Sequence, residues 1–473
     1  MPQLFFTDLS ALRQSVTVDG VVHELSAEEI TVAENLGLTD GMPFILGDDG
    51  SYDHELNRFF RACPAMGVRS PNSLRAYGRD ILIWMRFLAE RRNNKPLWAA
   101  DRHDVTAFYA ARRLALPPAR ISAASWNRAI AALDKLYRWA VEESVIEKSP
   151  FTYRQSWRRT GGGSITIAAN TATERGARTR DVRFLSLDRY LLFRDIGLRG
   201  RLPDGSEDPT WQGRNSERNA LFAELLVTTG LRLQEAASLL LVELPAPDPT
   251  SRSRSFRLAP AIAKGSKGRV IRLPERVLKC LHEYAALERT NVLTRRQSGG
   301  CSIERPIRVV SHDRRTLLLE KQAVRAGVDV LTPAARSRLV WVDTCQPLSL
   351  WLAEGARPMP AAAWEAVFRR ASERCRRFGI DLDVTPHMLR HSFAGHMLSL
   401  LVREQIGWVV DQRQTHICAA YRRLIGDPLL KLQRLLGHSR IESTYIYLDY
   451  LEESQELVDA AVQAWELRVG GSP

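Results

Sequence analysis

Cysteine is scarce in this sequence, and the few cysteines are scattered. The chain has 473 residues and six cysteines, none of them in a CxxC pair. Zinc sites of the finger or ribbon type and disulfide frameworks both need clustered or regularly spaced cysteines. We therefore expect neither a zinc site nor a disulfide framework, and the thiols are typical of a reducing compartment.

Long apolar runs are also missing. No segment approaches the roughly 20 apolar residues that a helix needs to cross a bilayer. The first residues, MPQLFFTDLSALRQS, include Asp8 where a signal peptide would need its apolar core. No internal repeat indicates a solenoid. We expect a cytoplasmic, nucleoid-associated protein that makes no membrane contact.

Acidic residues are fewer than basic ones. The chain has 67 Lys and Arg against 54 Asp and Glu, which gives a net charge of +13 and a pI of about 9.7. An excess of this size favours a polyanionic partner, most often DNA or RNA; a basic soluble enzyme without such a partner is the alternative. The hydrophobic content of 45% is typical of folded domains, and the length favours two or three of them.

Helical periodicity begins near residue 70. Residues 1–68 are acidic and mixed, and we treat them as an N-terminal extension of unknown role. The string SPNSLRAYGRDILIWMRFLAERR has apolar residues every three or four positions, the stripe of a core-facing helix, and starts with Ser70 as N-cap before a proline. Further helices near 104–113 and 122–146 complete a small helical domain over 69–152. Its basic faces carry the candidate DNA contacts Arg75, Arg79, Arg128 and Lys135.

The segment 153–182 separates this domain from the rest of the chain. It is rich in Gly, Thr and Arg and has no convincing periodicity, so we predict a basic linker. A β-hairpin within one domain is the alternative. From 183 to 473 the pattern is that of one large domain, in which SFRLAPAIA and RVIRLP are expected to pair as a hairpin around KGSKG. Its helices are expected near 219–240, 275–288, 361–378, 386–400 and 429–436.

The string TPHMLRHSF places a histidine and an arginine on one helical face. Thr385 and Pro386 mark a helix start, so His387 and Arg390, three residues apart, can reach a single ligand group. A guanidinium is always charged and matches phosphate oxygens in a bidentate manner. His391 raises a metal-ligand alternative, but the chain lacks the glutamate of an HExxH site and an evident third ligand.

Arg232 follows Gly230 in TTGLRLQEA, at the end of one helix or at the bend into another. Glu235, three residues later, can hold the guanidinium of Arg232 from behind. An ordinary surface Arg–Glu pair is the alternative if this string is considered alone.

The string LLGHSRIESTYIYLDY combines one histidine with three tyrosines. Gly437 can close the preceding helix, and SRIE forms a capping box for a new one. Tyr447 would lie two turns into that helix, with its hydroxyl within reach of His438. Tyr445 and Tyr450 compete with it, and spacing alone does not choose among the three.

The turn KGSKG carries Lys264 and Lys267. A lysine at the tip of a hairpin can enter a DNA groove and donate a proton to a leaving alkoxide. A solvated turn lysine without a function is the alternative.

The order of these strings is more specific than any one of them. Together they resemble the tyrosine recombinase (phage integrase) family, whose pattern runs Arg, Lys, His-x-x-Arg, His and Tyr. The similarity covers roughly residues 69–470, and the family spacing selects Tyr447 among the tyrosines and Lys264 over Lys267. It implies a mainly α fold with a small β-sheet: a helical, SAM-like core-binding domain over 69–152 and an α+β catalytic domain over 183–473.

The resemblance also implies a mechanism that needs no cofactor, metal or ATP. Tyr447 would attack the scissile phosphate and form a 3′-phosphotyrosyl link, releasing a 5′-hydroxyl. Arg232 and Arg390 would stabilise the charge on the phosphoryl oxygens. A second strand's 5′-hydroxyl would then reverse the reaction.

Other residues take supporting roles in this scheme. Lys264 is implied as the general acid for the leaving oxygen, and His387 as the general base or proton shuttle. His438 would hydrogen-bond a phosphate oxygen, and Glu235 would support the site from behind. Lys267 is a further candidate DNA contact beside Lys264.

The implied partner is double-stranded DNA carrying specific recombination sites, for integration or excision of a mobile element. The tail after Tyr447 has apolar residues at helical spacing; it either packs within the chain or docks into the next protomer of a homotetramer on DNA. Accessory proteins are also conceivable partners. One departure from the family is that Arg390 and His438 are 48 positions apart, about twice the usual separation, which indicates an insertion over about 403–426.

Two rival functions share these residues. A type IB topoisomerase-like relaxase would use the same cleavage chemistry without joining two duplexes. A DNA-binding protein with an inactive site is the alternative from a different class. The target sequence, the direction of reaction, and whether Tyr447 acts on its own protomer's phosphate or a neighbour's do not follow from the sequence.

Overall fold

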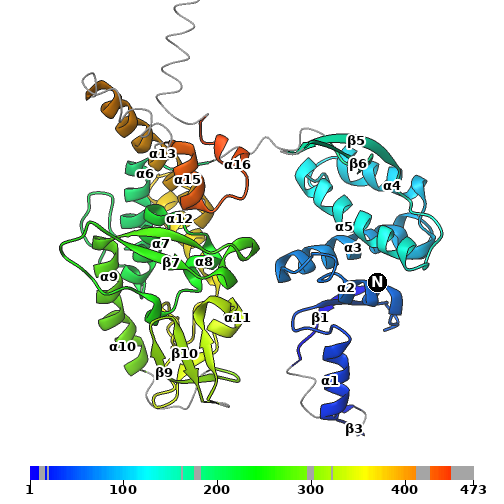
Figure 1. Cartoon of the computed structure of the whole chain (residues 1–473), viewed down its shortest axis with the longest axis horizontal. Helices are drawn as coiled ribbons and strands as arrows, with labels where there is room; N and C mark the ends of the chain where they lie inside the picture. The colour runs from blue at the N-terminus through cyan, green and yellow to red at the C-terminus, as the bar shows by residue number, and fades with distance from the viewer. Residues whose placement is uncertain are drawn as a thin grey trace, which may run out of the picture. The chain divides into compact units, whose positions relative to one another are not determined.

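The computed structural model describes residues 1–9, 16–18, 21–160, 163–174, 183–295, 303–320, 323–411 and 427–448. Over these residues the chain is largely helical with small sheets, which confirms the mainly α fold with an α+β second part. It divides into two compact units, Met1–Arg180 and Asp181–Pro473, coloured blue to teal and green to red in Figure 1.

The first unit consists of helices with short hairpins. Its helical segments are α1 (Ala27–Asn35), α2 (His54–Ala62), α3 (Pro71–Arg91), η2 (Leu97–Ala99), α4 (Arg102–Tyr109), the π turn η3 (Ala110–Leu114) and α5 (Ala123–Glu142). Its strands form the antiparallel pairs β1 (Gln3–Phe6) with β4 (Pro43–Leu46), β2 (Val16–Val18) with β3 (Val21–His23), and β5 (Tyr153–Thr160) with β6 (Gly163–Asn170).

The core of the first unit lies between α3 and α5. α3 begins at Pro71 with Ser70 as N-cap, as predicted, although the serine side chain makes no capping hydrogen bond. The apolar stripe of α3, which includes Ile81 and Trp84, is buried. Trp84 Nε1 donates to Tyr137 Oη of α5 at 2.8 Å. Burying either polar group without a partner would be costly, so this bond fixes how the two helices meet.

α2 belongs to the same core. Leu56, Phe59 and Phe60 are buried together with residues of α3 and α5. Phe59 packs on Trp139 of α5 with ring centroids 5.5 Å apart. The C-terminal part of the predicted extension 1–68 therefore packs with the helical domain, because YDHELNRFFRAC forms a strongly amphipathic helix.

The predicted linker 153–182 contains the hairpin of β5 and β6, which the sequence left open as the alternative. Its register runs from the pair Tyr153 and Asn170 towards the turn. Tyr153 Oη and Asn170 Nδ2 both donate to Asp134 Oδ1 of α5, at 2.7 and 2.8 Å. β5 and β6 are thus a paired element attached to α5 and not a loose linker, whereas 161–162 and 175–182 lie outside the described residues.

The second unit contains the helical segments α6 (Leu187–Leu192), the π turn η4 (Phe193–Leu198), α7 (Ser216–Thr229), α8 (Leu233–Ala237), η5 (Leu241–Glu243), η6 (Pro260–Ile262), η7 (Lys264–Ser266), α9 (Glu275–Ala286), α10 (Glu288–Thr294), η9 (Val328–Val330), α11 (Pro333–Arg336), α12 (Ala361–Arg377), α13 (Pro386–Asp411), α15 (Pro428–Leu436) and α16 (Glu442–Tyr445). Its strands are β7 (Ser253–Leu258), β8 (Arg269–Pro274), β9 (Ile307–Asp313), β10 (Thr316–Leu319), β11 (Arg325–Gly327) and β12 (Leu339–Trp341). α13, α15 and α16 lie together at one end of this unit in Figure 1.

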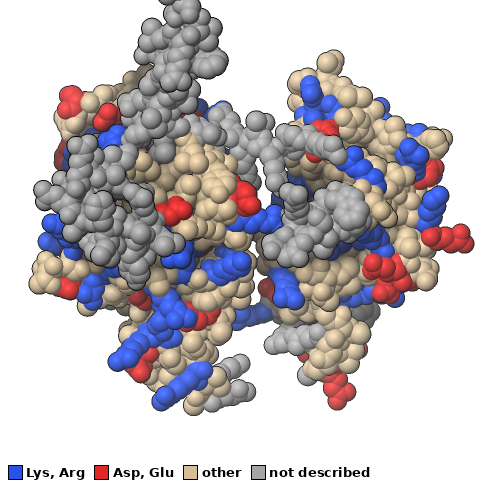
Figure 2. All heavy atoms as spheres, turned by 45° about the horizontal axis from the view of Figure 1, so that its top comes forward, with Lys and Arg blue, Asp and Glu red and all other residues tan. Residues whose placement is uncertain are grey.

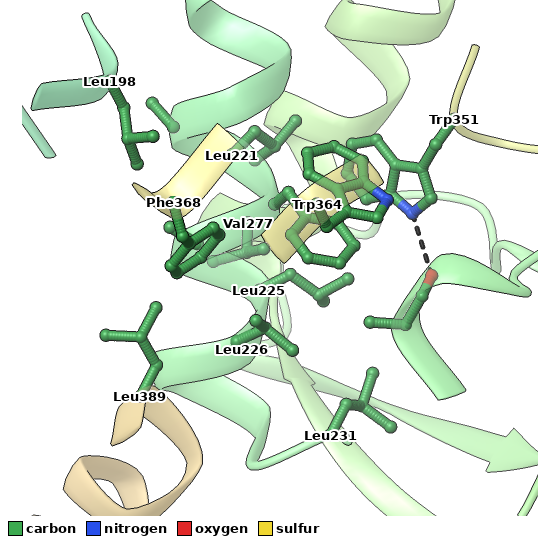
Figure 3. Close-up of a cluster of buried hydrophobic side chains, with 14 of the residues drawn as sticks. Leu198, Leu221, Leu225, Leu226, Leu231, Val277, Trp351, Trp364, Phe368 and Leu389 are labelled. Carbon is green, nitrogen blue, oxygen red and sulfur yellow. Dashed lines mark hydrogen bonds between the residues drawn. The ribbon is translucent and has the colours of Figure 1, made fainter. Parts of the chain in front are cut away.

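The core of the second unit surrounds α7, which is buried along most of its length. Phe222 of α7 stacks on Trp364 of α12 with ring centroids 3.6 Å apart. Trp351 Nε1 donates to the carbonyl of Ala236 in α8 at 2.9 Å, the dashed line in Figure 3. Full burial of each such apolar side chain stabilises the fold by about 1.5–3 kcal/mol.

Two leucines of this core directly precede the two predicted catalytic arginines. Leu231 and Leu389 are buried in the cluster drawn in Figure 3. The backbone positions of Arg232 and Arg390 are therefore set by core packing and not by surface loops.

A mixed four-stranded sheet, ordered β11-β10-β9-β12, is inserted between α10 and α12. It has its own small core, made of Leu240, Val309, Leu317, Val328, Leu339 and Leu348. Arg336 joins this sheet to η5, because its guanidinium donates to Glu243 Oε2 at 2.6 Å and to Oε1 at 3.0 Å, with both side chains buried.

Several predicted elements differ in extent from the structure. The helix expected over 219–240 breaks at Gly230, whose φ of 64° is left-handed and ends α7. The strand expected over SFRLAPAIA ends at Leu258, because the chain turns at Pro260. α13 continues beyond residue 400 to Asp411, into the predicted insertion 403–426, of which 412–426 lie outside the described residues.

Candidate active site

Arg390 joins three separate segments. Its Nη1 donates to the carbonyl of Gly230 at the end of α7, and its Nη2 donates to the carbonyl of Leu436 at the end of α15, at 2.7 Å. The side chain is 2% exposed. Burial first, and then the nearby charge of Arg232, lower the pKa of Arg390 to about 9. The guanidinium therefore stays protonated at neutral pH, with other N–H donors available for a ligand.

Arg232 is held by Glu235 at the start of α8. The Arg232 backbone N donates to Glu235 Oε2 at 2.9 Å, and Nη1 donates to Oε1 at 3.0 Å. The Arg232 side chain is 25% exposed, whereas Glu235 is almost fully buried. Arg232 thus keeps part of its guanidinium open to solvent while its stem and backbone are fixed.

Gly230 makes the turn before Arg232 and the contact with α13. A Cβ at this position would lie 2.3 Å from the ring of Phe393 in α13. Its left-handed φ and this close approach both require glycine. The Gly230 carbonyl that accepts from Arg390 is placed by the same turn.

Arg269, the first residue of β8, binds the other side of Glu235. Its Nη1 and Nη2 donate to Glu235 Oε1 and Oε2 at 2.9 and 2.7 Å, and its Nε donates to the Leu435 carbonyl at 2.9 Å. Burial alone would raise the pKa of Glu235, but the hydrogen bonds and charge of Arg269, followed by those of Arg232, lower it to about 2. Glu235 is therefore an anion at neutral pH.

His438 follows the C-terminal end of α15. Gly437 ends the helix with a φ of 65°, as predicted from LLGHS. His438 Nδ1 lies 3.0 Å from Thr444 Oγ1, and Gln433 Nε2 donates to the His438 carbonyl at 3.1 Å. Burial, followed by the charges of Arg390 and Arg232, lowers the pKa of His438 to about 3. His438 is therefore a neutral hydrogen-bonding group at physiological pH.

Tyr447 lies beside the histidines of α13. Its Oη is 2.8 Å from His391 Nδ1, and its ring is nearly parallel to that of His438, with centroids 6.3 Å apart. His387 and His391, one turn apart, have ring centroids 4.3 Å apart in an edge-to-face arrangement. Tyr447, His438, His391 and His387 thus form one continuous set of rings next to Arg390.

The helix that was predicted to carry Tyr447 is shorter than expected. α16 begins at Glu442 with Ile441 as N-cap, so SRIE does not form the predicted capping box. The helix ends at Tyr445, and Tyr447 lies in the turn that follows. Thr444, fully buried and bonded to His438, fixes this turn.

Lys264 and Lys267 lie in the connection between β7 and β8, and both are exposed. Gly265 between them has a φ of 70°. Within the described part of the chain, Lys264 is not hydrogen-bonded to the arginine and histidine cluster, although β8, which follows it, places Arg269 in that cluster.

The predicted DNA contacts of the first unit lie on α3 and α5. Arg75 and Arg79 are exposed on α3. Arg128 is 55% exposed but forms a bidentate pair with Asp80 at 2.9 Å. Lys135 donates to the Met66 carbonyl at 3.2 Å and is only partly exposed. Figure 2 shows Lys and Arg side chains on the visible face of each unit, interspersed with Asp and Glu.

Two residues of the cluster were missing from the predicted set. Arg269 lies within KGSKGRVIRL. It is two positions before the buried Ile271, so strand alternation places its side chain on the apolar face of β8. His391 was considered only as a metal ligand, and its contact with Tyr447 depends on chain segments 56 residues apart. Among the described residues, no cluster of His, Cys, Asp and Glu could hold a metal ion. No helix in the described part of the chain has both the length and the apolar character to span a bilayer.

Two family models match parts of the chain. Residues 56–144 match the family model described as phage integrase, N-terminal SAM-like domain, and residues 208–403 match the phage integrase family model. The second match ends before His438 and Tyr447, so their assignment depends on spacing and geometry.

Relatives of similar length exist among bacterial recombinases. Tyrosine recombinase XerD of Mycobacterium leprae is 25% identical over 380 residues, covering 80% of this chain and 86% of that protein. Tyrosine recombinase XerC of Bradyrhizobium diazoefficiens is 25% identical over 426 residues, covering 88% and 94%. Among solved structures, XerH site-specific recombinase bound to palindromic difH substrate has a TM-score of 0.46 at 15% identity, covering 86% of this chain and 83% of that one.

Proposed function

The chain belongs to the phage integrase family of tyrosine recombinases, which cleave and rejoin DNA at specific sites, and we propose that Tyr447 is its nucleophile. The Tyr447 oxygen attacks the scissile phosphorus, the bond to the 5′ oxygen breaks, and a 3′-phosphotyrosyl link forms with a free 5′-hydroxyl. The link conserves the energy of the phosphodiester, so a second 5′-hydroxyl can reverse the step without ATP or metal.

Arg232 and Arg390 bind the phosphoryl oxygens in this proposal. Both are fixed by the fold before DNA arrives: Arg232 by Glu235, and Arg390 by two backbone carbonyls. Donors that need no reorganisation during the reaction contribute most to stabilising the transition-state charge. The neutral His438 adds a hydrogen bond to a phosphoryl oxygen.

Proton transfer requires an acceptor for the Tyr447 proton and a donor for the leaving oxygen. We assign His387 as the general base or shuttle, reached through His391, whose Nδ1 is within 2.8 Å of Tyr447 Oη. Lys264 is the general acid, carried on an exposed turn that can enter a DNA groove. Each proton removed from the phenol is thus matched by one delivered to the 5′ oxygen.

One observation supports this proposal above the others. Arg390 binds the carbonyls two residues before Arg232 and two residues before His438, and Tyr447 touches the residue after Arg390. Residues from three distant parts of the sequence, 230–232, 390–391 and 436–447, are thereby brought to one place. An arrangement built only for stability would not need two cations at a single position.

The substrate in this proposal is double-stranded DNA carrying recombination sites of a mobile element. Arg75, Arg79, Arg128, Lys135 and Lys267 are proposed phosphate contacts, since non-specific attraction depends on such cations. We propose that a homotetramer on DNA joins two duplexes through the tail 449–473, which lies outside the described residues, with accessory proteins as further partners. The protein would act in the cytoplasm, on the nucleoid.

The nucleophile assignment is tested with Tyr447→Phe. The substrate is a duplex taken from the DNA that flanks the gene. It carries a nick beside the candidate cleavage position, so that the short strand released by cleavage diffuses away and the adduct is trapped. We call it the nicked substrate. Wild-type protein should form a covalent adduct with it, unaffected by EDTA, and Tyr447→Phe should form none while binding DNA normally. Tyr445→Phe is the matched control and should retain the adduct. An adduct formed by Tyr447→Phe would overturn the assignment, and loss of wild-type cleavage in EDTA would favour a metal nuclease.

A further inference from the structure

Arg269 makes contacts that its place at the start of a strand does not require. The side chain is only 7% exposed. It donates twice to Glu235 and once to the Leu435 carbonyl, at 2.9, 2.7 and 2.9 Å. All three groups of its guanidinium therefore have fixed partners, in α8 on one side and at the end of α15 on the other.

The glycine of LLGHS is part of the same arrangement. A Cβ built at Gly437 would lie 2.8 Å from Arg269 Cδ and 3.3 Å from its Nε. The stem of Arg269 thus occupies the space beside the turn that leads into His438. The turn and the arginine fit together only because residue 437 has no side chain, and its φ of 65° also favours glycine.

We propose that Arg269 is a positioning residue of the strand-transfer site. It holds Arg232 through Glu235 and holds His438 through the end of α15. The two residues are thereby kept at the separation that one phosphate group requires. The inference rests on the proposed function of Arg232 and His438. Arg269 itself does not touch DNA in this proposal, because its side chain is buried and each of its three nitrogens already donates to a partner within the protein.

The shared carboxylate is the link to Arg232. Glu235 Oε1 accepts from both Arg232 Nη1, at 3.0 Å, and Arg269 Nη1, at 2.9 Å. Among the described residues, only Arg269 donates to both oxygens of Glu235 and to a carbonyl of α15, so replacing it removes this link between α8 and α15. A displacement of about 1 Å in a reacting group can lower a rate about 100-fold.

The charges around Glu235 make the role measurable. The groups that face it are Arg232 from its own helix, Arg269 from β8 and Arg390 from α13. Without Arg269, burial would dominate and raise the pKa of Glu235, so the carboxylate would become protonated as the pH falls. A protonated Glu235 holds Arg232 less strongly. Cleavage by such a variant should therefore fall at acidic pH over a range in which wild type is unaffected.

The experiment compares Arg269→Gln, Arg269→Lys and the double variant Arg269→Gln/Glu235→Gln in the full-length protein. Arg272→Gln, an exposed arginine of the same strand, is the matched control. Single-turnover cleavage of the nicked substrate is measured from pH 5 to 9 (about the range in which most domains stay folded), together with the Kd for the same DNA and the unfolding midpoint.

We expect Arg269→Gln to cleave about 100-fold more slowly, with a Kd within about threefold of wild type and a new loss of rate at acidic pH. The double variant should be slow without that acidic loss, because no carboxylate remains to titrate. Arg269→Lys should keep the charge and show no acidic loss, yet remain slow, since one ammonium cannot span two oxygens and a carbonyl. Arg272→Gln should behave as wild type.

Two results would overturn the inference: full activity of Arg269→Lys, or the same pH profile for Arg269→Gln as for wild type. If Arg269→Gln does not fold, the cleavage rate of Arg269→Lys still decides whether Arg269 sets the positions of Arg232 and His438. A failure of wild type itself to form an adduct would instead count against the proposed function, so the two failures are distinguishable.

Discussion

The two arginines of the site keep their charge by different means. Arg232 is partly exposed and paired with Glu235. Arg390 is buried, and burial together with the charge of Arg232 lowers its pKa to about 9. Its charge is present at neutral pH, so the guanidinium can bind a phosphoryl oxygen. His438, with its pKa lowered to about 3, is neutral from acidic to alkaline pH and adds no charge to this balance.

His391 supports a prediction at the residue scale. In His391→Phe an aromatic ring is kept but the hydrogen-bond partner of the Tyr447 hydroxyl is lost. Single-turnover cleavage of the nicked substrate should therefore fall about 100-fold with DNA binding unchanged. His391→Asn places an oxygen near the position of Nδ1 and should lose less. Equal activity of His391→Phe and wild type would show that the 2.8 Å contact has no part in cleavage.

The sequence predicted residues whose signal is local and missed Arg269 and His391, whose partners are distant. Arg232 with Glu235 and His387 with Arg390 are three apart, so helical spacing alone indicates that they act together. Arg269 has partners 34 and 166 positions away, and no short window of sequence contains both. It lies beside the KGSKG turn, whose lysines were predicted to contact DNA, whereas its own side chain is buried.

At the scale of elements, periodicity predicted helices well and their ends less well. α9, α12 and α15 begin and end within a few residues of expectation. The expected helix over 219–240 ran through the break after α7 because the apolar pattern continues past Gly230, although TTGLRLQEA alone indicated a helix end or a bend there. The helix predicted after His438 was longer than α16, because SRIE has the form of a capping box. In the structure, a hydrogen bond between Thr444 and His438 fixes that turn instead.

The break between α7 and α8 leads to a prediction about Gly230. Gly230→Ala places a Cβ 2.3 Å from Phe393 at a left-handed φ. Denaturant unfolding should show a loss of about 2 kcal/mol or more in the free energy of unfolding, and cleavage should fall because the carbonyl that binds Arg390 moves.

Gly395 of α13 is the matched control, since a Cβ there meets nothing within 4 Å. Gly395→Ala should leave stability unchanged or raise it by about 0.5–1 kcal/mol, because alanine favours the helix interior. If Gly230→Ala were as stable and active as Gly395→Ala, the turn would not be what places Arg390.

At the scale of the whole molecule, the sequence indicated a helical first part and an α+β second part, and both are present. It did not show that α2 completes the core of the first unit, because an isolated amphipathic helix carries no information about its partner. The sheet of β9 to β12 was also not foreseen, since its strands are short and lie inside a segment without clear periodicity.

The tail supports a prediction about assembly. Its apolar positions Leu457, Val458 and Trp465 are proposed to dock into a neighbouring protomer. Leu457→Glu/Trp465→Glu should abolish recombinant joints between two duplexes and the tetramer–DNA band in a native gel, because a buried charge without a partner is strongly unfavourable. Adduct formation on the nicked substrate should remain.

Gln463→Glu, between the apolar positions, is the control for charge alone and should preserve joint formation. Recombinant joints formed at the wild-type rate by the double variant would contradict the proposed role of the tail. Adduct formation without joints by the wild-type protein would favour the topoisomerase-like relaxase.

Leu231 and Leu389 lie in the hydrophobic core immediately before Arg232 and Arg390. Loosening of that core by heat displaces both arginines at once. A mutation that weakens the core should therefore lower both the thermal stability and the activity. Selection for survival at higher temperature would act on recombination through side chains that never meet DNA. Heat-sensitive alleles of this gene should accordingly map to the leucines and tryptophans around α7 as often as to the catalytic positions.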